Sequence, residues 1–181
     1  MSDKPKFKRA SEVIISELML PSHSNFSGKI HGGYILSMMD SVAFACASKY
    51  SGFYCVTASV NTVDFLAPIE VGELVSMKAM VNYVGKSSMV IGIRVESENI
   101  QSGATKHCNS SYFTMVAKDD DGNTTDVPGL ILESKEDVRR FLRSIERFKK
   151  KKERSSKYGA DFKLEAHISE LEGTNTRLLL S

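Results

Sequence analysis

Long apolar runs are absent from this chain of 181 residues. No stretch reaches the ~18–20 apolar residues that a membrane-spanning helix needs, so we expect no contact with a membrane. The chain begins with the basic segment MSDKPKFKRA, and the apolar stretch of a secretory signal peptide does not follow it. Together these absences predict a cytoplasmic protein.

Cysteine is scarce, and its spacing does not fit the common metal and redox motifs. No CxxC pattern occurs, and the count is odd, with Cys46, Cys55 and Cys108. We therefore predict buried, reduced thiols with a structural role. Histidine predicts no metal site either, because no metal-ligand spacing links the four residues His23, His31, His107 and His167.

Positive charge is concentrated in one part of the chain. Residues 134–181 hold 13 Lys and Arg against 8 Asp and Glu, whereas residues 1–133 hold 11 against 14. The base-rich part is a tail, and no helix-turn-helix pattern precedes the main segment, so no nucleic-acid partner is predicted. We expect a domain at residues 1–133 and a basic C-terminal helix and tail at residues 134–181.

Hydrophobic periodicity and turn residues divide the chain into elements. The connections between the later strand-like runs are short, at Gly85-Lys86 and at residues 101–104, which predicts antiparallel neighbours. A switch in side-chain parity predicts a β-bulge near Asn61 and Thr62. The expected strands cover residues 11–20, 54–68, 73–85, 87–100 and 105–119, and the expected helices cover residues 31–50 and 134–156.

The helix predicted at residues 31–50 determines the fold class. Apolar residues occupy nearly all of its faces, and Asp40 is its only acidic residue. A helix that is apolar on all sides is a buried one, so a sheet has to wrap around it. We predict an α+β domain in which one curved antiparallel sheet encloses a central helix.

The second predicted helix, residues 134–156, begins with a capping-box pattern. Ser134 and Asp137 stand three positions apart at its start. An apolar stripe follows, so we expect this helix to dock on the domain or on a neighbouring molecule. The stripe consists of Val138, Phe141, Leu142, Ile145 and Phe148, and a run of lysines at residues 149–152 comes after it.

Four sequence blocks resemble one enzyme family in order and in spacing. They are NFSGKIHGGYILSMMD at 25–40, VDFLAPIEVGELV at 63–75, YVGKSSM at 83–89 and YFTMVAKDDDGNTTDVPGL at 112–130. The chain resembles the hotdog-fold acyl-CoA thioesterases of the bacterial short-chain and eukaryotic cytosolic acyl-CoA hydrolase type. The resemblance implies a hotdog fold and a homodimer whose two sheets join into one, assembled further into a trimer of dimers.

The resemblance also implies a catalytic pair. In this family the Asn of the N-x-x-G-x-x-HGG segment and the Asp of the following helix act together, and these positions fall on Asn25 and Asp40. Each site would take Asn25 from one subunit and Asp40 from the other. Asp40 is expected to act as a general base for water or as a direct nucleophile, and the sequence leaves both open. A structural carboxylate that caps backbone groups near the dimer interface is the alternative, as is a turn-forming role for Asn25.

The HGG residues are candidates for stabilising an oxyanion. Gly32 and Gly33 offer N–H groups at the start of a helix, where the helix dipole favours negative charge. The alternative is that glycine permits the close approach of a partner chain. His31 is expected to cap the helix, to assist proton transfer to the leaving thiolate, or to pack against its neighbours.

Two further groups are candidates for substrate binding. In the family the turn that holds Lys86, Ser87 and Ser88 lies near the CoA nucleotide, and an ordinary hairpin turn is the alternative. Thr57 and Ser59 alternate with apolar residues and are expected to line the pantetheine channel.

The expected reaction is the hydrolysis of acyl-CoA to a free fatty acid and CoA. No metal and no cofactor is expected, since CoA belongs to the substrate. Two alternatives stay open. One is a hotdog acyl-thioester dehydratase, which usually needs a positioned His with a carboxylate, and the other is a non-catalytic acyl-CoA-binding regulator. The acyl chain length depends on the depth of the tunnel between the subunits, which the sequence does not give.

Overall fold

The computed structural model describes residues 4–157, 162–163, 167–171 and 175. The chain divides into two compact units, residues 1–144 and residues 145–181. The strands and the first long helix belong to the first unit. In the described part of the chain, no helix is both long enough and apolar enough to cross a membrane.

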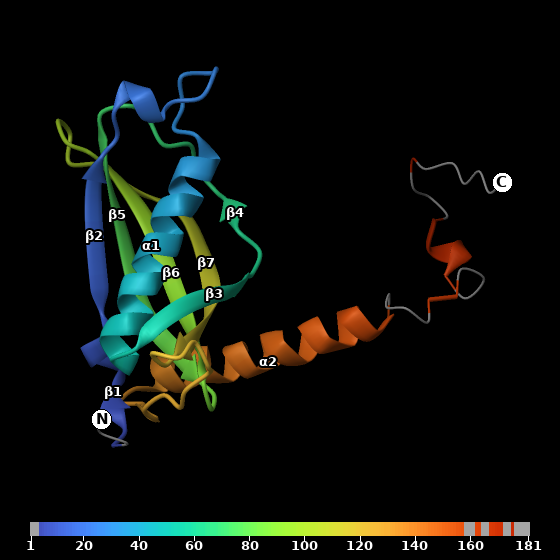
Figure 1. Cartoon of the computed structure of the whole chain (residues 1–181). Coiled ribbons are helices and arrows are strands. Elements are labelled where there is room, and N and C mark those ends of the chain that lie inside the picture. The colour runs from blue at the N-terminus through green and yellow to red at the C-terminus, as the bar shows by residue number, and fades with distance from the viewer. Residues whose placement is uncertain (1–3, 158–161, 164–166, 172–174, 176–181) are drawn as a thin grey trace. The chain divides into compact units, whose positions relative to one another are not determined.

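A six-stranded antiparallel sheet is the framework of the first unit (Figure 1). Its strand order is β2-β5-β6-β7-β3, and β4 also pairs with β7. The predicted hairpins β5–β6 and β6–β7 are confirmed, because both pairs run antiparallel along nearly their whole length. The strands are β2 (Val13–Leu18), β3 (Tyr54–Val60), β4 (Asp64–Phe65), β5 (Glu73–Val84), β6 (Ser88–Asn99) and β7 (Thr105–Lys118).

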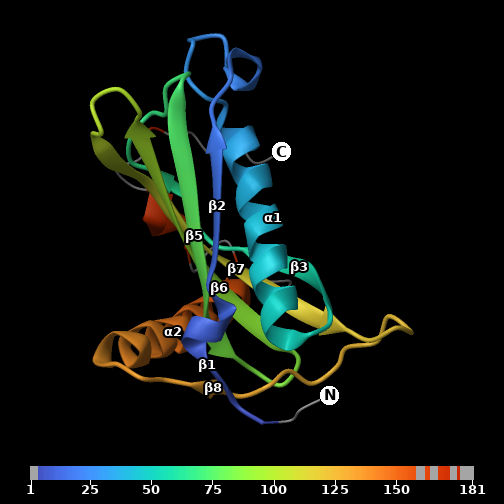
Figure 2. The same cartoon turned by 90° about the vertical axis from the view of Figure 1, so that its left-hand side faces the viewer.

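Helix α1 (Gly32–Ser51) lies against one face of this curved sheet (Figure 2). Its buried residues recur every three or four positions and meet alternate residues of the strands, as the two periodicities require. Burial of each large apolar side chain contributes about 1.5–3 kcal/mol, so this contact holds the unit together. The core includes Ile35, Met39, Val42, Cys46 and Tyr50 of α1 and Val75, Met77, Val81, Ile91, Val95, Phe113 and Met115 of the sheet.

The prediction that α1 is buried on all sides is wrong for the single chain. An exposed stripe runs along the helix through Ser37, Asp40, Ser41 and Phe44. The sheet covers α1 from one side only, and Phe44 remains 38% exposed. Asp40 therefore lies on an open face of the helix and not in the core.

The predicted position of the β-bulge is also wrong. The pairing of β3 with β7 shifts register between Thr57 and Ser59, so Ala58 is the extra residue. Residues 61–63, where the parity switch predicts a bulge, instead separate β3 from β4. A bulge bends its strand and redirects the neighbouring side chains, and this one directly follows Thr57.

A second, two-stranded sheet is not predicted by the sequence patterns. Strand β1 (Lys6–Phe7) pairs in parallel with β8 (Leu130–Ile131). The hydroxyl of Tyr50, at the end of α1, donates to the main-chain oxygen of Gly129 at 2.6 Å and fastens α1 to this pair. Because the two strands lie far apart in the sequence, no local periodicity reveals their pairing.

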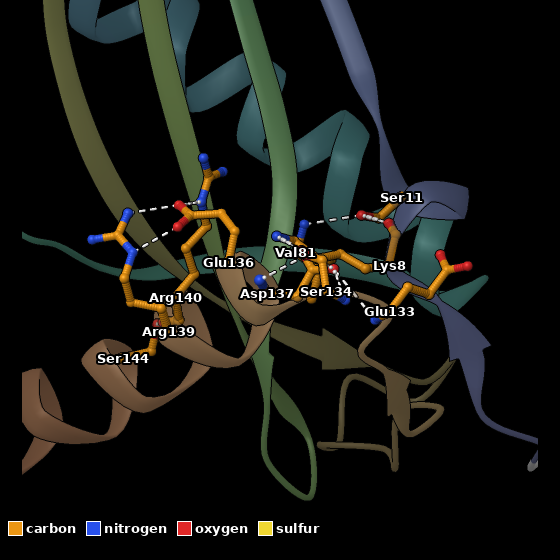
Figure 3. Close-up of polar contacts among 10 residues, drawn as sticks. All are labelled: Lys8, Ser11, Val81, Glu133, Ser134, Glu136, Asp137, Arg139, Arg140 and Ser144. Carbon is orange, nitrogen blue, oxygen red and sulfur yellow. Dashed lines mark hydrogen bonds and ion pairs between the residues drawn. The ribbon is translucent and has the colours of Figure 1, made fainter.

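Helix α2 (Lys135–Lys157) begins with the predicted capping box (Figure 3). The N–H of Asp137 donates to Ser134 Oγ at 3.1 Å, and the N–H of Ser134 donates to Asp137 Oδ2 at 3.2 Å. Lys8 Nζ donates to the other carboxylate oxygen, Asp137 Oδ1, at 2.7 Å, and this lysine is only 3% exposed. The N-terminal segment thus fixes the first turn of α2.

The apolar stripe of α2 was predicted to dock on the domain or on a neighbouring molecule, and in the first unit one of its residues docks on the domain. Phe141 packs on Tyr83, with ring centroids 5.0 Å apart. Val138 and Leu142 are 44% and 57% exposed. The second unit contains the end of α2 and a short 3₁₀ helix, Ile168–Leu171, and the side chain of residue 152 in the lysine run lies outside the described residues.

Candidate active site

A tight turn at residues 25–29 precedes α1. The N–H of Gly28 donates to the main-chain oxygen of Asn25 at 3.0 Å, and Gly28 has a φ of 77°, which glycine adopts without strain. Asn25 Oδ1 accepts hydrogen bonds from the N–H of Ser27 at 2.9 Å, from its hydroxyl at 2.7 Å and from the N–H of Lys29 at 3.2 Å. The N-x-x-G spacing is therefore the spacing of a turn that holds the asparagine side chain.

His31 caps α1 and accepts a hydrogen bond from one of the two glycine amides. Its Nδ1 accepts a hydrogen bond from the N–H of Gly33 at 2.9 Å. A Cβ at position 33 would lie 3.0 Å from two ring atoms of His31, so a larger residue there would require the ring to shift. Within the described residues the N–H of Gly32 has no acceptor. The N–H of Gly32 is thus a free donor at the helix start, whereas the N–H of Gly33 already donates to His31.

A cavity of about 380 Å³ opens beside the Asn25 turn. Asn25 and Gly32 line it, and each carries a hydrogen-bond donor with no acceptor in the described part of the chain. The sequence did not single out Phe65 and Leu66, which lie after the bulge, line the cavity and are 53% and 63% exposed. The other lining residues are Lys29, Ile30, Ile35, Ala67, Pro68 and Ile69.

Asp40 is hydrogen-bonded to the sheet from the exposed stripe of α1. Thr57 Oγ1 donates to Asp40 Oδ1 at 2.6 Å, a short bond to a charged acceptor that orients the carboxylate. Large apolar side chains stand exposed nearby, and the rings of Phe44 and Tyr54 contact each other with centroids 5.5 Å apart. The acidic group is thus oriented, open to solvent and set in apolar surface.

A single chain keeps Asp40 away from the Asn25 turn. Asp40 follows Gly32 in the same helix at a rise of roughly 12 Å. It does not line the cavity that Asn25 and Gly32 share. Asp40 is therefore separate from the cavity lined by Asn25 and Gly32 within one protomer.

The polar turn with Lys86, Ser87 and Ser88 lies at the far end of β5. That strand begins beside the Asn25 turn, where Lys29 Nζ contacts a carboxylate oxygen of Glu70 at 2.6 Å, and it extends for roughly 36 Å. Ser59 is half-buried on β3, just beyond the bulge. Of these expected substrate contacts, the polar turn is distant from Asn25 within the chain.

The cysteines are buried and free, as predicted, with Sγ of Cys46 donating to the main-chain oxygen of Ser11 at 3.1 Å. Burial raises the pKa of the Cys46 thiol to about 12, so this cysteine supplies little nucleophilic thiolate near neutral pH. Among the described residues, no group of three or more His, Cys, Asp or Glu side chains gathers that could hold a metal ion.

Comparison with known proteins identifies the family. The profile of the thioesterase superfamily matches residues 27–104. Protein VdlD of Helicobacter pylori is 38% identical to the chain over 137 residues, which make up 76% of this chain and 78% of the relative. A hexameric acyl-CoA thioesterase, crystallised in its apo form, superposes with a TM-score of 0.81 at 31% identity, over 84% of this chain and 97% of that one. The chain belongs to the thioesterase superfamily.

A second similar structure was solved with ligands bound. The acyl-CoA hydrolase of Staphylococcus aureus was solved with butyryl-CoA, CoA and CoA disulfide, and it matches with a TM-score of 0.77 at 28% identity, over 92% of this chain and 98% of that one. Variants of that hydrolase with an aspartate, a threonine or an asparagine replaced by alanine have also been solved. The predicted hotdog fold is confirmed by these matches.

Proposed function

We propose that this member of the thioesterase superfamily hydrolyses acyl-CoA to a free fatty acid and CoA. The observation that carries the proposal is the Asp40 carboxylate, which Thr57 holds at 2.6 Å on an exposed helix face. An oriented carboxylate beside apolar surface suits a substrate that has an acyl chain and a carbonyl group for water to attack. The reaction needs no metal and no cofactor, because CoA is part of the substrate.

In the proposed reaction Asp40 takes a proton from water while the water oxygen bonds to the thioester carbonyl carbon. The carbonyl oxygen becomes an oxyanion, which accepts hydrogen bonds from the N–H of Gly32 and from Nδ2 of Asn25. The carbon–sulfur bond then breaks, CoA leaves as a thiolate, and the proton on Asp40 passes to it. One donor of this kind accelerates acyl transfer by roughly 10²–10³ in other enzymes. Direct attack by Asp40, through a mixed anhydride that water then hydrolyses, gives the same products.

The proposed active unit is a homodimer in which Asn25 and Gly32 of one protomer face Asp40 of the partner subunit. The separation of roughly 12 Å along α1 supports a shared site, because one chain cannot bring both groups to one carbonyl. Strand β3 ends the sheet order, and exposed apolar residues such as Tyr54 and Val60 lie on it. An edge of this kind is suited to pairing with a second chain. The hexameric relative supports a trimer of dimers.

The remaining roles follow from the same proposal. Thr57 orients Asp40 and, with Ser59, lines the channel for the pantetheine arm. The nucleotide end of CoA, which carries phosphate charge, is bound by Lys86, Ser87 and Ser88.

In the same proposal the catalytic domain is residues 1–133, and the basic helix and tail are an addition to it. The protein works in the cytoplasm.

A dehydratase is less well supported by the geometry. That chemistry pairs a histidine with a carboxylate, and His31 and Asp40 are separated by roughly 13 Å along α1. The Nδ1 atom of His31 is also engaged by the N–H of Gly33. Within one chain these residues do not form an acid–base pair.

Release of free CoA from a series of acyl-CoA substrates, from acetyl-CoA to palmitoyl-CoA, tests the proposal. The thiol is followed with a chromogenic thiol reagent, and the expected result is turnover that peaks at one range of chain lengths. Binding of CoA is measured in parallel by calorimetry. Binding without thiol release at any chain length would overturn the enzymatic proposal in favour of an acyl-CoA-binding regulator.

A further inference from the structure

The turn before α1 contains a serine that the proposed mechanism does not use. We infer that Ser27 is a positioning residue, which holds the side-chain amide of Asn25 so that its nitrogen is presented to the thioester carbonyl. This inference rests on the proposed function, in which Asn25 donates a hydrogen bond to the oxyanion. Ser27 acts through Asn25.

The orientation of the Asn25 amide follows from its partners. Its oxygen faces the N–H of Ser27 at 2.9 Å and the N–H of Lys29 at 3.2 Å. Main-chain N–H groups only donate, so the atom that faces them has to be the amide oxygen. Nδ2 consequently points away from the turn, and it has no acceptor among the described residues. The turn converts Asn25 into an oriented donor.

The Ser27 hydroxyl makes the shortest of these contacts. Its Oγ donates to Asn25 Oδ1 at 2.7 Å, and it is the one side-chain donor of the set. The last torsion of an asparagine side chain has broad preferences, so two hydrogen bonds from the backbone leave the amide free to tilt. A third donor on the same oxygen narrows that range and keeps Nδ2 in one direction.

Ser27 does not contribute to the packing of the core, so a substitution there tests its hydrogen bond alone. The residue is exposed, and its hydroxyl contacts the side chain of Asn25. The buried core does not include it. Loss of the hydroxyl should therefore alter the direction of the amide and leave the fold intact.

Steady-state kinetics of Ser27→Ala in the full chain test the inference. The expected result is a kcat lowered about tenfold, as for the loss of one hydrogen bond, with KM changed by less than about twofold. Ser27→Thr keeps the hydroxyl and should restore kcat. Ser24→Ala is the matched control, because it removes a hydroxyl that also donates at 2.7 Å in this loop, to the main-chain oxygen of Pro21 and not to Asn25.

A double variant separates this inference from the proposed function. Ser27→Ala should cause no further loss of kcat in an Asn25→Ala background, because the group that it positions is gone. Unchanged kcat in Ser27→Ala, beside a large loss in Asn25→Ala, would overturn the positioning role alone. Full activity of Asn25→Ala would instead remove Asn25 from the proposed mechanism, and the role of Ser27 with it. Equal losses in Ser27→Ala and Ser24→Ala would indicate a general effect on the loop and would also overturn the inference.

Discussion

The two ends of the Asn25 side chain have different surroundings. The oxygen accepts from three donors of its own turn, whereas the nitrogen has no acceptor in the described part of the chain. The residue lines the cavity. The turn needs the oxygen and the proposed chemistry needs the nitrogen. A substitution can therefore separate the structural role of this residue from its catalytic role.

Asn25→Asp should keep the turn and lose the reaction. An aspartate accepts the same hydrogen bonds from Ser27 and Lys29, but it has no N–H to offer an oxyanion and adds a repulsive charge. We expect kcat to fall by at least about 100-fold while the free energy of unfolding changes little. Stopped assays of thiol release and urea unfolding measure the two effects. Activity close to that of the wild type would show that the side-chain nitrogen is not required.

Asp40→Asn should abolish hydrolysis without unfolding the protein. The new side chain has nearly the same shape and can still accept the hydrogen bond from Thr57, but it is neither a base nor a nucleophile. We expect less than about a tenth of the wild-type kcat, a loss of more than ~1.4 kcal/mol in transition-state stabilisation. Ser41→Ala, at the next position of the same exposed stripe, is the control and should retain full activity. A kcat above this limit in Asp40→Asn would exclude Asp40 as the catalytic group.

A cluster of ion pairs lies on neighbouring strands of the sheet. Glu96 of β6 accepts from Lys78 Nζ at 2.5 Å and from Arg94 Nε at 2.6 Å. The hydrogen bond from Lys78, and then that from Arg94, lower the pKa of the Glu96 carboxyl to about 2. A carboxyl with a lowered pKa stabilises the folded state above its unfolded-state pKa of about 4.5, and this contribution disappears as the pH falls through about 2.

Glu96→Gln should therefore destabilise the protein in a pH-dependent way. We expect the difference in unfolding free energy from wild type to be constant above about pH 5 and to shrink towards zero near pH 2. Chemical denaturation at a series of pH values measures it. Glu98→Gln, an exposed substitution on the same strand, should give a difference that is small at every pH. An effect of Glu96→Gln that does not vary with pH would show that the ion pairs do not contribute.

The first turn of α2 depends on a buried ion pair that sequence spacing does not reveal. Lys8 contacts Asp137 at 2.7 Å, with side chains that are 4% and 17% exposed. The next residue, Arg9, contacts Glu133 at 2.9 Å but is 68% exposed. Burial raises the pKa of Asp137, but hydrogen bonds from Lys8 and Ser134 outweigh it and lower the pKa overall.

Lys8→Met should cost far more stability than Arg9→Met. Removing one partner of a buried pair leaves a carboxylate without its counter-charge, which costs about 3 kcal/mol, whereas an exposed pair contributes less than ~1 kcal/mol. Urea unfolding at one fixed protein concentration compares the two variants, because assembly changes apparent stability. Equal losses would mean that the burial of Lys8 has no energetic consequence.

The proposed dimer accounts for the exposed stripe of α1. Phe44 and Asp40 are open in the single chain, and the donors beside Asn25 are roughly 12 Å further along α1. A second copy would cover the apolar surface and bring a carboxylate to the donors in one step. In the proposed dimer each half supplies what the other lacks.

Mixing two inactive variants should restore activity. Asn25→Ala and Asp40→Asn protomers that pair at random form mixed dimers, each with one intact site, and we expect roughly a quarter of the wild-type activity. Differently tagged protomers allow subunit exchange to be confirmed by native mass spectrometry. Confirmed exchange without recovered activity would contradict a shared site.

The sequence by itself determined the parts of this protein that depend on neighbours along the chain. Periodicity, short connections and local hydrogen bonds determine three kinds of feature. These are the helices α1 and α2, the hairpins β5–β6 and β6–β7, and the capping box of Ser134 and Asp137. The N-x-x-G spacing likewise encodes the turn around Asn25. These features could be predicted because their energies come from residues only a few positions apart.

Only the tertiary structure decided which distant segments meet. It placed β3 at the end of the sheet beside β7, paired β1 with β8, and put the bulge at Ala58. It also opened one face of α1 and set Asp40 on it, against the prediction of a helix buried all round. The apolar pattern of α1 indicates that its faces avoid water. It does not indicate whether the sheet or a second chain covers each face. That choice depends on non-local packing, which a pattern of neighbouring residues does not contain.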